Sequence, residues 1–204
     1  MTRLGILLSG RGSNFVSIAE AIREHRLQGV EIAVVLSNVA DAVGLKVASE
    51  MGFAAIAVPS VGRKRLEHNA EMIAVLQQHN VDLVCLAGYM RILTADFVCA
   101  FPDRILNVHP SLLPSFSGLD AQRQALEFGS KVAGCTVHFV DEAVDHGAIV
   151  IQRTVPVLDE DTAESLSARV LEQEHIAYPE AIARVVGGEY ELRGRRYVRA
   201  GTRS

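Results

Sequence analysis

The first half of the chain alternates short apolar runs with longer segments of helical periodicity, and this alternation limits the possible folds more than any other feature. Four apolar runs predict buried strands, at residues 4–8, 31–36, 54–58 and 83–86. Helical periodicity separates them at residues 13–26, 42–51 and 64–79, with Ser13 or Asn14 as the expected first cap. This order predicts an α/β fold with a doubly wound, mostly parallel, Rossmann-like sheet and right-handed crossovers.

The second half follows a different pattern. Two strands, at 136–140 and 149–157, are joined by the loop 141–147, which is too short for a crossover. We therefore expect an antiparallel extension in the C-terminal half. The remaining elements are helices at 94–100, 122–128 and 163–186, a strand at 104–108, and a hairpin at 190–198 around Gly194.

Composition excludes several classes of protein. With 204 residues and 49% apolar content, the chain can bury a large core. A net charge of −4 and the lack of tryptophan disfavour a nucleic-acid partner. No leader sequence and no apolar run near ~18 residues is present, so we expect no membrane partner and a cytoplasmic location. Cys85, Cys99 and Cys135 lack CxxC spacing, which predicts reduced core thiols and no metal.

Asn107 and His109 are the first candidate site. They follow a strand-like run and lie two residues apart, so both side chains point to one face of an extended segment. Pro110 then ends the strand. An amide beside an imidazolium at a strand end supplies the donors that a developing oxyanion needs. The alternative is a capped strand end with a hydrogen-bonded histidine.

The loop Ser9–Asn14 is the second candidate site, because it follows the first strand and opens the first helix. Gly10 and Gly12 permit a tight turn, and the amides of Gly12, Ser13 and Asn14 would face a ligand at the positive end of the helix. Without a third glycine or a P-loop lysine, the loop fits a monophosphate better than NAD or ATP. A tight turn without a ligand is the alternative.

Asp145 is a candidate partner for His109. Gly147 allows a sharp turn before the strand at 149, which would place the Asp145 carboxylate at the edge of the sheet. A carboxylate there would orient His109 and favour the imidazolium. The alternative is an exposed aspartate in a turn.

Three further segments carry open alternatives. Residues 86–93 either line a flat aromatic pocket or form a buried turn. Glu174 and His175 are more typical of a solvated helix face. The C-terminal arginines indicate a solvated tail more than a binding surface; they are Arg193, Arg195, Arg196, Arg199 and Arg203.

Taken together, these residues resemble the phosphoribosylglycinamide formyltransferases, the folate-dependent transformylases of purine biosynthesis. The resemblance extends from about residue 3 to about residue 190. Its most specific motifs, in chain order, are residues 9–14, 86–93, 107–114, 134–140 and 145–147. It implies the formyltransferase fold in a single domain over 1–204, with a mononucleotide-binding half at 1–100, a catalytic and folate-binding half at 101–190 and a tail at 191–204.

The resemblance also implies a role for each matching residue. The catalytic residues would be Asn107, His109 and Asp145. The ribonucleotide would contact Gly12, Ser13 and Asn14 through its phosphate, and Glu174. The folate would contact Arg65, Met90, Arg91, Ile92, Leu93, Asn107, Asp141, Glu142, Ala143, Val144 and Asp145. The family often has a histidine in the loop before the short helix, and Asp120 and Gln122 stand at the two candidate positions for it. His146 stands where a small residue or glycine is common.

The implied reaction transfers a formyl group from 10-formyltetrahydrofolate, the co-substrate, to the amine of glycinamide ribonucleotide, without a metal, in a monomer or homodimer. One alternative is formyltetrahydrofolate deformylase, whose additional N-terminal domain would not fit before residue 3. Methionyl-tRNA formyltransferase adds a basic C-terminal domain, which the expected chain end and negative charge disfavour. The last alternative is a nucleotide-binding module without activity, which the set of Asn107, His109 and Asp145 disfavours.

Overall fold

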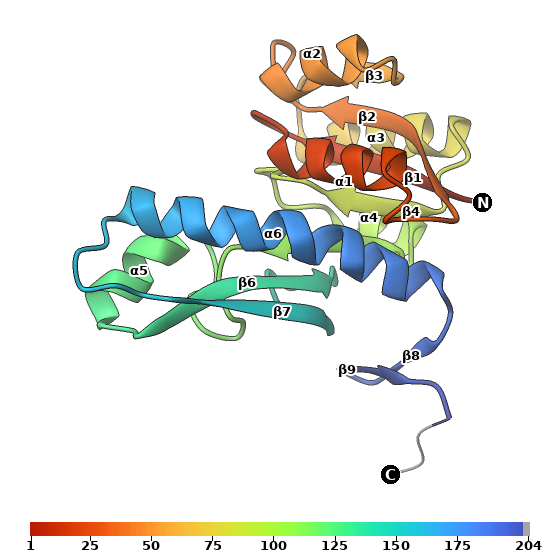
Figure 1. Ribbon diagram of the computed structural model, residues 1–204. Coiled ribbons are helices and arrows are strands. Elements are labelled where there is room, and N and C mark those ends of the chain that lie inside the picture. Colours follow the sequence, from red (N-terminus) through yellow and green to blue (C-terminus); the bar gives the residue numbers. More distant parts are fainter. Residues whose placement is uncertain (202–204) are drawn as a thin grey trace. The chain divides into compact units, whose positions relative to one another are not determined.

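The computed structural model describes residues 1–201, so Arg203 and the end of the expected tail lie outside it. The chain divides into two compact units, and the boundary between them lies between Asn107 and Val108. Figure 1 labels their helices and strands. No helix of residues 1–201 is long and apolar enough to cross a membrane.

The first unit is built on a parallel sheet whose strands are in the order β3-β2-β1-β4-β5. The strands are β1 (Thr2–Leu8), β2 (Val30–Ser37), β3 (Ala55–Ala57), β4 (Leu83–Leu86) and β5 (Ile105–His109), the last of which crosses into the second unit. The helices are α1 (Ser13–Arg23), α2 (Val43–Glu50), α3 (Arg65–Gln78) and α4 (Ala95–Ala100). The predicted doubly wound, mostly parallel sheet is confirmed.

The strand order of the first unit reverses between β1 and β4, and this reversal positions two loops. Open α/β sheets bind ligands outside the carboxyl ends of the strands that flank such a reversal. Leu7 of β1 aligns with Leu86 of β4, and Leu86 aligns with Asn107 of β5. The loops after β1 and β4 therefore leave the same edge of the sheet, where the sequence analysis expected ligand contacts.

The second unit contains a mixed sheet in the order β6-β7-β9-β8. Its elements are α5 (Ala121–Phe128), β6 (Val132–Phe139), β7 (Ile149–Pro156), α6 (Ala163–Val186), β8 (Tyr190–Arg193) and β9 (Arg196–Arg199). β6 and β7 pair antiparallel, as predicted, and α6 packs along both (Figure 1). The predicted hairpin at 190–198 is also confirmed, and it joins β7 where Ile149 pairs with Arg196.

Close backbone packing explains two glycines in this second sheet. A Cβ on Gly134 would lie 2.0 Å from the carbonyl oxygen of Arg153 on β7, and a Cβ on Gly147 would lie 1.8 Å from that of Phe139. Both positions therefore exclude side chains. Gly147 thus fixes the C-terminal end of the loop 141–147 against β6.

Three local expectations are wrong. The first helix is capped by Gly12, and not by the side chain of Ser13 or Asn14. Cys99 is exposed, so only Cys85 and Cys135 are core thiols; all three are free. Glu174 is buried on α6 and does not belong to a solvated face, because α6 packs this side against the sheet.

Candidate active site

Backbone geometry forms the loop between β1 and α1. Gly12 adopts φ 75°, in the left-handed region that favours glycine, and caps α1. Its Cα also leaves no room for a side chain, because a Cβ there would lie 2.9 Å from the Cα of Gly44 on α2. Gly44 in turn donates its amide to the carbonyl of Gly10 at 2.9 Å. These contacts fix the shape of the loop, which leads directly into the N-terminus of α1, the positive end of the helix dipole.

Ser9 joins this loop to the loop after β4. Its hydroxyl donates to Oδ1 of Asn38 at 2.5 Å and accepts the amide of Met90 at 2.9 Å, while its own amide donates to the carbonyl of Gly88. The sequence analysis assigned no role to Ser9 or Asn38. The sequence signal for these two residues was their position: the hydroxyl of Ser9 directly follows β1, and the amide of Asn38 directly follows β2.

The segment 90–93 follows β4 and exposes two apolar side chains to solvent. Met90 is 71% exposed and Ile92 is 54% exposed. The alternative of a buried turn is therefore wrong for these two residues. Tyr89 beside them is buried, its hydroxyl donates to Sδ of Met72, and burial raises its pKa to about 12. Arg65, the first residue of α3, is exposed.

His109 and Asp145 meet in the second unit. Nδ1 of His109 lies 3.4 Å from Oδ2 of Asp145, and Nε2 donates to the carbonyl of Phe116 at 3.0 Å. Both ring nitrogens therefore face acceptors, which suits an imidazolium with two donors. Asn107 is half-buried and lies two positions before His109 on β5.

The Asp145 carboxylate is held by more than His109. Its Oδ2 accepts the amide of Gly118 at 2.9 Å, and the side chain is only 10% exposed. The alternative of an exposed turn aspartate is therefore wrong. Asp145 also adopts φ 52°, an uncommon backbone conformation that surrounding contacts must stabilise.

His138 is a second imidazole beside this carboxylate. Its Nε2 lies 3.8 Å from Oδ1 of Asp145, and its Nδ1 donates to the carbonyl of Phe139 at 2.7 Å. Burial is the main cause that lowers the pKa of His138 from 6.5, and His109 lowers it further, whereas Asp145 opposes the shift. His138 is therefore neutral near pH 7 and offers Asp145 no positive charge.

Thr136, two positions before His138 on β6, holds the turn that follows His109. Its hydroxyl donates to the carbonyl of Ser111 at 2.7 Å and accepts the amide of Leu113 at 3.0 Å. Gln152 donates to the same hydroxyl and to the carbonyl of Leu113. The sequence analysis missed Thr136, His138 and Gln152 as supporting residues, although polar residues at period two in an apolar strand were the available signal.

The loop 141–147 is organised around Asp141. Its carboxylate accepts the amide of Ala143 at 3.0 Å and Nδ1–H of His146 at 2.9 Å. Glu142, Ala143 and Val144 are exposed at the tip of the loop. Their side chains are thus accessible to a ligand, as the expected folate contacts of this loop require.

Glu174, the remaining expected ribonucleotide contact, is buried on α6 near Cys135. Burial raises the pKa of the Cys135 thiol to about 12, and the charge of Glu174 adds to the shift. This thiol stays protonated and unreactive near neutral pH. Asp120 caps α5 with φ 57° and is exposed, with its carboxylate 3.8 Å from Arg123.

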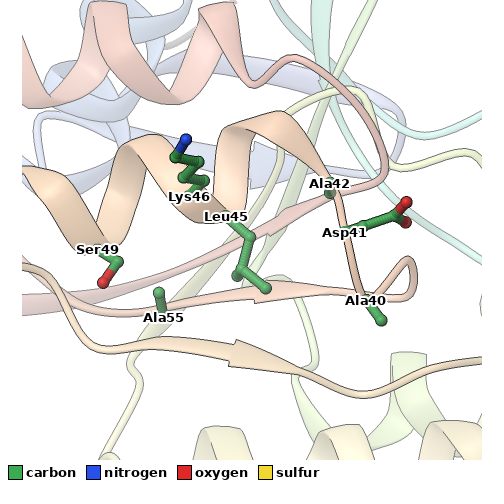
Figure 2. Close-up of a pocket in the computed structure, with 7 residues that line it drawn as sticks. All are labelled: Ala40, Asp41, Ala42, Leu45, Lys46, Ser49 and Ala55. Atoms are coloured by element: carbon green, nitrogen blue, oxygen red, sulfur yellow. The ribbon is translucent and has the colours of Figure 1, made fainter.

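A hollow of about 360 Å³ lies elsewhere in the first unit, and it contains none of the expected site residues. Figure 2 shows its lining residues on α2, on the loop before it and on β3. Its lining combines small and apolar residues with one carboxylate, Asp41, and one ammonium group, Lys46. Within residues 1–201, no cluster of three or more histidine, cysteine, aspartate or glutamate side chains could hold a metal ion.

Residues 2–182 match the formyl transferase family. The phosphoribosylglycinamide formyltransferase of Haemophilus influenzae is 43% identical over 95% of this chain and 91% of its own length. The crystal structure of glycinamide ribonucleotide transformylase 1 from Symbiobacterium toebii has 50% identity and a TM-score of 0.95, covering 98% of this chain and 94% of that one. The chain belongs to the phosphoribosylglycinamide formyltransferase family. The resemblance found in the sequence is confirmed.

Members of the formyl transferase family also occur inside longer proteins. The trifunctional purine biosynthetic protein adenosine-3 of Drosophila melanogaster is 43% identical over 91% of this chain, which spans 14% of that relative. A formyltetrahydrofolate deformylase from Pseudomonas syringae shares the fold at a TM-score of 0.89 and 25% identity, and this chain covers 66% of it. The deformylase is thus the more distant of the two activities among these relatives.

Proposed function

We propose that this chain transfers the formyl group of 10-formyltetrahydrofolate to the amine of glycinamide ribonucleotide, in the synthesis of purines. Membership in the formyltransferase family supports the reaction class. The observation that carries the proposal is the buried contact between Nδ1 of His109 and the carboxylate of Asp145, at 3.4 Å. It provides an oriented imidazole donor beside a strand end, which an acyl transfer through an oxyanion requires.

The ribonucleotide phosphate is held by the first turn of α1 in this proposal. Gly12 supplies the left-handed cap, and the amides of Ser13 and Asn14 belong to the helix start, where the partial positive charge favours an anion. Glu174 contacts the remainder of the ribonucleotide. Anchoring the substrate at groups remote from the amine supplies the orientation on which a bimolecular transfer depends.

The folate is held by Arg65, by Met90, Arg91, Ile92 and Leu93, by Asn107, and by the loop 141–145. The exposed side chains of Met90 and Ile92 offer an apolar surface to the pteridine. The side chains of Glu142, Ala143 and Val144 are exposed at the tip of that loop and are available for contact with the folate.

The amine attacks the formyl carbon and produces a tetrahedral oxyanion, which accepts one hydrogen bond from the Asn107 amide and one from His109. Nε2 of His109 donates to the carbonyl of Phe116 before substrate binds. The oxyanion replaces this carbonyl as the acceptor. Phe116 adopts φ 53°, so the segment that must yield is already in an uncommon backbone conformation.

Asp145 orients His109 through Nδ1 and stabilises its charged form. When the intermediate collapses, the bond from carbon to the folate nitrogen breaks. The amine loses one proton, and the folate nitrogen gains one, through His109 or a water beside Asp145. The products are the formylated ribonucleotide and tetrahydrofolate, and no step requires a metal.

One assay tests this proposal against its alternatives. Purified protein is mixed with 10-formyltetrahydrofolate, with and without glycinamide ribonucleotide, and folate absorbance is followed. Turnover that requires the ribonucleotide supports the transferase. Equal turnover without it supports the deformylase, and no turnover in either mixture supports a binding module; both outcomes would overturn the proposal.

The proposal places the enzyme in the cytoplasm, as a monomer or homodimer, with neither nucleic acid nor membrane as a partner. The three free cysteines are consistent with a reducing compartment. Cell fractionation and sedimentation of the purified protein test these two statements.

A further inference from the structure

The side chain of Arg195 reaches from the turn between β8 and β9 to the loop 141–147. One terminal nitrogen of its guanidinium contacts Nε2 of His146, and the other donates to the main-chain carbonyl of His146 at 2.6 Å. The hairpin itself is fixed to β7 where Arg196 pairs with Ile149. Arg195 therefore holds both the side chain and the backbone of one residue from a sheet-anchored position.

The two neighbours of His146 fix the hydrogen-bond role of each of its ring nitrogens. Arg195 has only donors, so Nε2 of His146 must accept. Asp141 has only acceptors when ionised, so Nδ1 must donate, at 2.9 Å. The imidazole of His146 thus links the carboxylate of Asp141 to the guanidinium of Arg195. The planar fork of arginine presents two preorganised donors for this double contact, a geometry that a lysine ammonium lacks.

His146 directly follows Asp145, whose backbone conformation needs support from its surroundings. The Asp145 side chain contacts His109 and the amide of Gly118, and the loop ends at Gly147 against Phe139. Arg195 fixes the carbonyl of the residue between Asp145 and Gly147. We propose that Arg195 is a positioning residue that holds the loop 141–147, through His146, in the conformation that places Asp145 against His109.

This inference gives a role to two features of the sequence that the proposed function leaves unused. The hairpin lies beyond residue 182, where the family match ends. His146 stands at the position where the family resemblance leads one to expect a small residue, which could not make the side-chain half of the contact. The inference rests on the proposed function only for the role of Asp145; the hold on the loop is independent of it.

Amide exchange tests the hold without any substrate. The Ala143 amide donates to Asp141, and the Gly118 amide donates to Asp145, so both report on the loop. Arg195→Ala should speed exchange at both amides about five- to tenfold. Arg196→Ala is the matched control, because it removes the same charge from the next residue and its side chain has no ion pair or hydrogen bond among residues 1–201.

Three results would overturn the proposal: wild-type exchange in Arg195→Ala, equal acceleration in Arg196→Ala, or acceleration spread over the whole second unit. The last outcome would mean that the hairpin only stabilises the fold. Arg195→Lys is a second variant in case Arg195→Ala fails to fold. It keeps the charge and one contact, so amide exchange at Ala143 and Gly118 should be faster than in the wild type and slower than in Arg195→Ala.

Kinetics then separate positioning from binding. Arg195→Ala should lower kcat about tenfold while the KM for the ribonucleotide stays near the wild-type value, since a small displacement of a catalytic group lowers the rate without loss of remote anchoring. His146→Ala should lower kcat as well, and the two changes together should be less than multiplicative because they share one contact. Fully multiplicative effects would contradict the proposal. Absence of ribonucleotide-dependent turnover in the wild-type protein would instead refute the proposed function and leave the exchange result valid.

Discussion

The first loop and the loop 141–147 solve the same problem, holding a short segment in one shape, by different means. The first loop relies on backbone: the left-handed Gly12, its contact with Gly44, and one amide-to-carbonyl bond. The loop 141–147 relies on side chains: Asp145 and His146 contact groups from other segments of the second unit, and Asp141 binds His146 within the loop.

The difference suits the ligands proposed for each loop. A phosphate is recognised by backbone amides and a helix dipole, which need only the correct backbone path. A proton-transferring carboxylate must be oriented at one atom of one imidazole, which needs side-chain contacts. The comparison predicts that changes in the first loop alter binding, and that changes in the second loop alter the chemical step.

The largest effect should come from Asp145→Asn, which keeps the size of the side chain and removes its charge. We expect kcat to fall about 10²–10³-fold, with a much smaller rise in the KM for the ribonucleotide, and the acid limb of the rate profile to move. Steady-state kinetics across pH measure this, with Glu160→Gln, at an exposed position outside the proposed site, as the control. A wild-type rate and pH profile would refute the assigned role.

Gly12→Ala tests the backbone side of the comparison. An alanine at this position would have to adopt a positive φ, and its Cβ would lie 2.9 Å from the Cα of Gly44. We therefore expect a loss of about 2–4 kcal/mol in the free energy of unfolding. Gly10→Ala is the control, since no atom lies within 4 Å of its added Cβ. Urea denaturation of both variants should separate them, and equal losses would show that the shape of the loop does not depend on Gly12.

Ser13→Glu places a negative charge at the proposed phosphate site. We expect the KM for the ribonucleotide to rise about tenfold or more through charge repulsion, with kcat changed less. Stability should not fall, because an acidic residue at a helix start is favourable. Ser13→Gln keeps the length without the charge and should be milder. An unchanged KM in Ser13→Glu would count against the phosphate assignment.

The smallest expected effect is a loss of stability at acid pH, caused by one buried histidine in each unit, His68 and His138. Burial lowers the pKa of His68, whose Nε2 donates to the carbonyl of Val58, as it lowers the pKa of His138. At a pH below 6.5, the ordinary pKa of histidine, these two imidazoles take up protons in the unfolded chain but stay neutral in the folded chain. Stability should therefore be complete above about pH 6.5 and fall as pH drops toward the folded pKa values, by about 1.4 kcal/mol per pH unit for each histidine.

His68→Gln should lessen this acid loss, and His25→Asn, at an exposed position, should not. Unfolding midpoints at pH 7.5 and 5.5 measure the difference. An identical acid loss in wild type and His68→Gln would show that His68 is not kept neutral by burial.

Much of the fold was predictable because its elements are encoded locally. Apolar runs and helical periodicity predicted every strand and helix of both units to within a few residues, and the short connection predicted the antiparallel pair β6 and β7. Burial was less predictable. Cys99 and Glu174 were both misjudged, since local composition does not say which side of a short helix or of α6 meets the core.

The candidate site divides in the same way. His109, Asp145 and the loop at Gly12 were identifiable because residue type and strand-end position suggest their chemistry. His138, Thr136, Ser9 and Arg195 were not, because each acts through a partner far away in sequence. Periodicity places a polar side chain on one face of a strand, but it does not identify the atom that the side chain meets.

By itself, the order of apolar and polar residues determined the parallel sheet, and the residue types at the strand ends determined the chemistry they can offer, since both depend on short-range pattern. Five short motifs carried the resemblance to the family. The tertiary structure decided that the Asp145 carboxylate meets His109 with a neutral His138 behind it, and that Arg195 holds the neighbouring His146. The physical reason is that burial, desolvation and hydrogen bonding act at distances of about 3 Å between groups, and only the folded chain sets those distances.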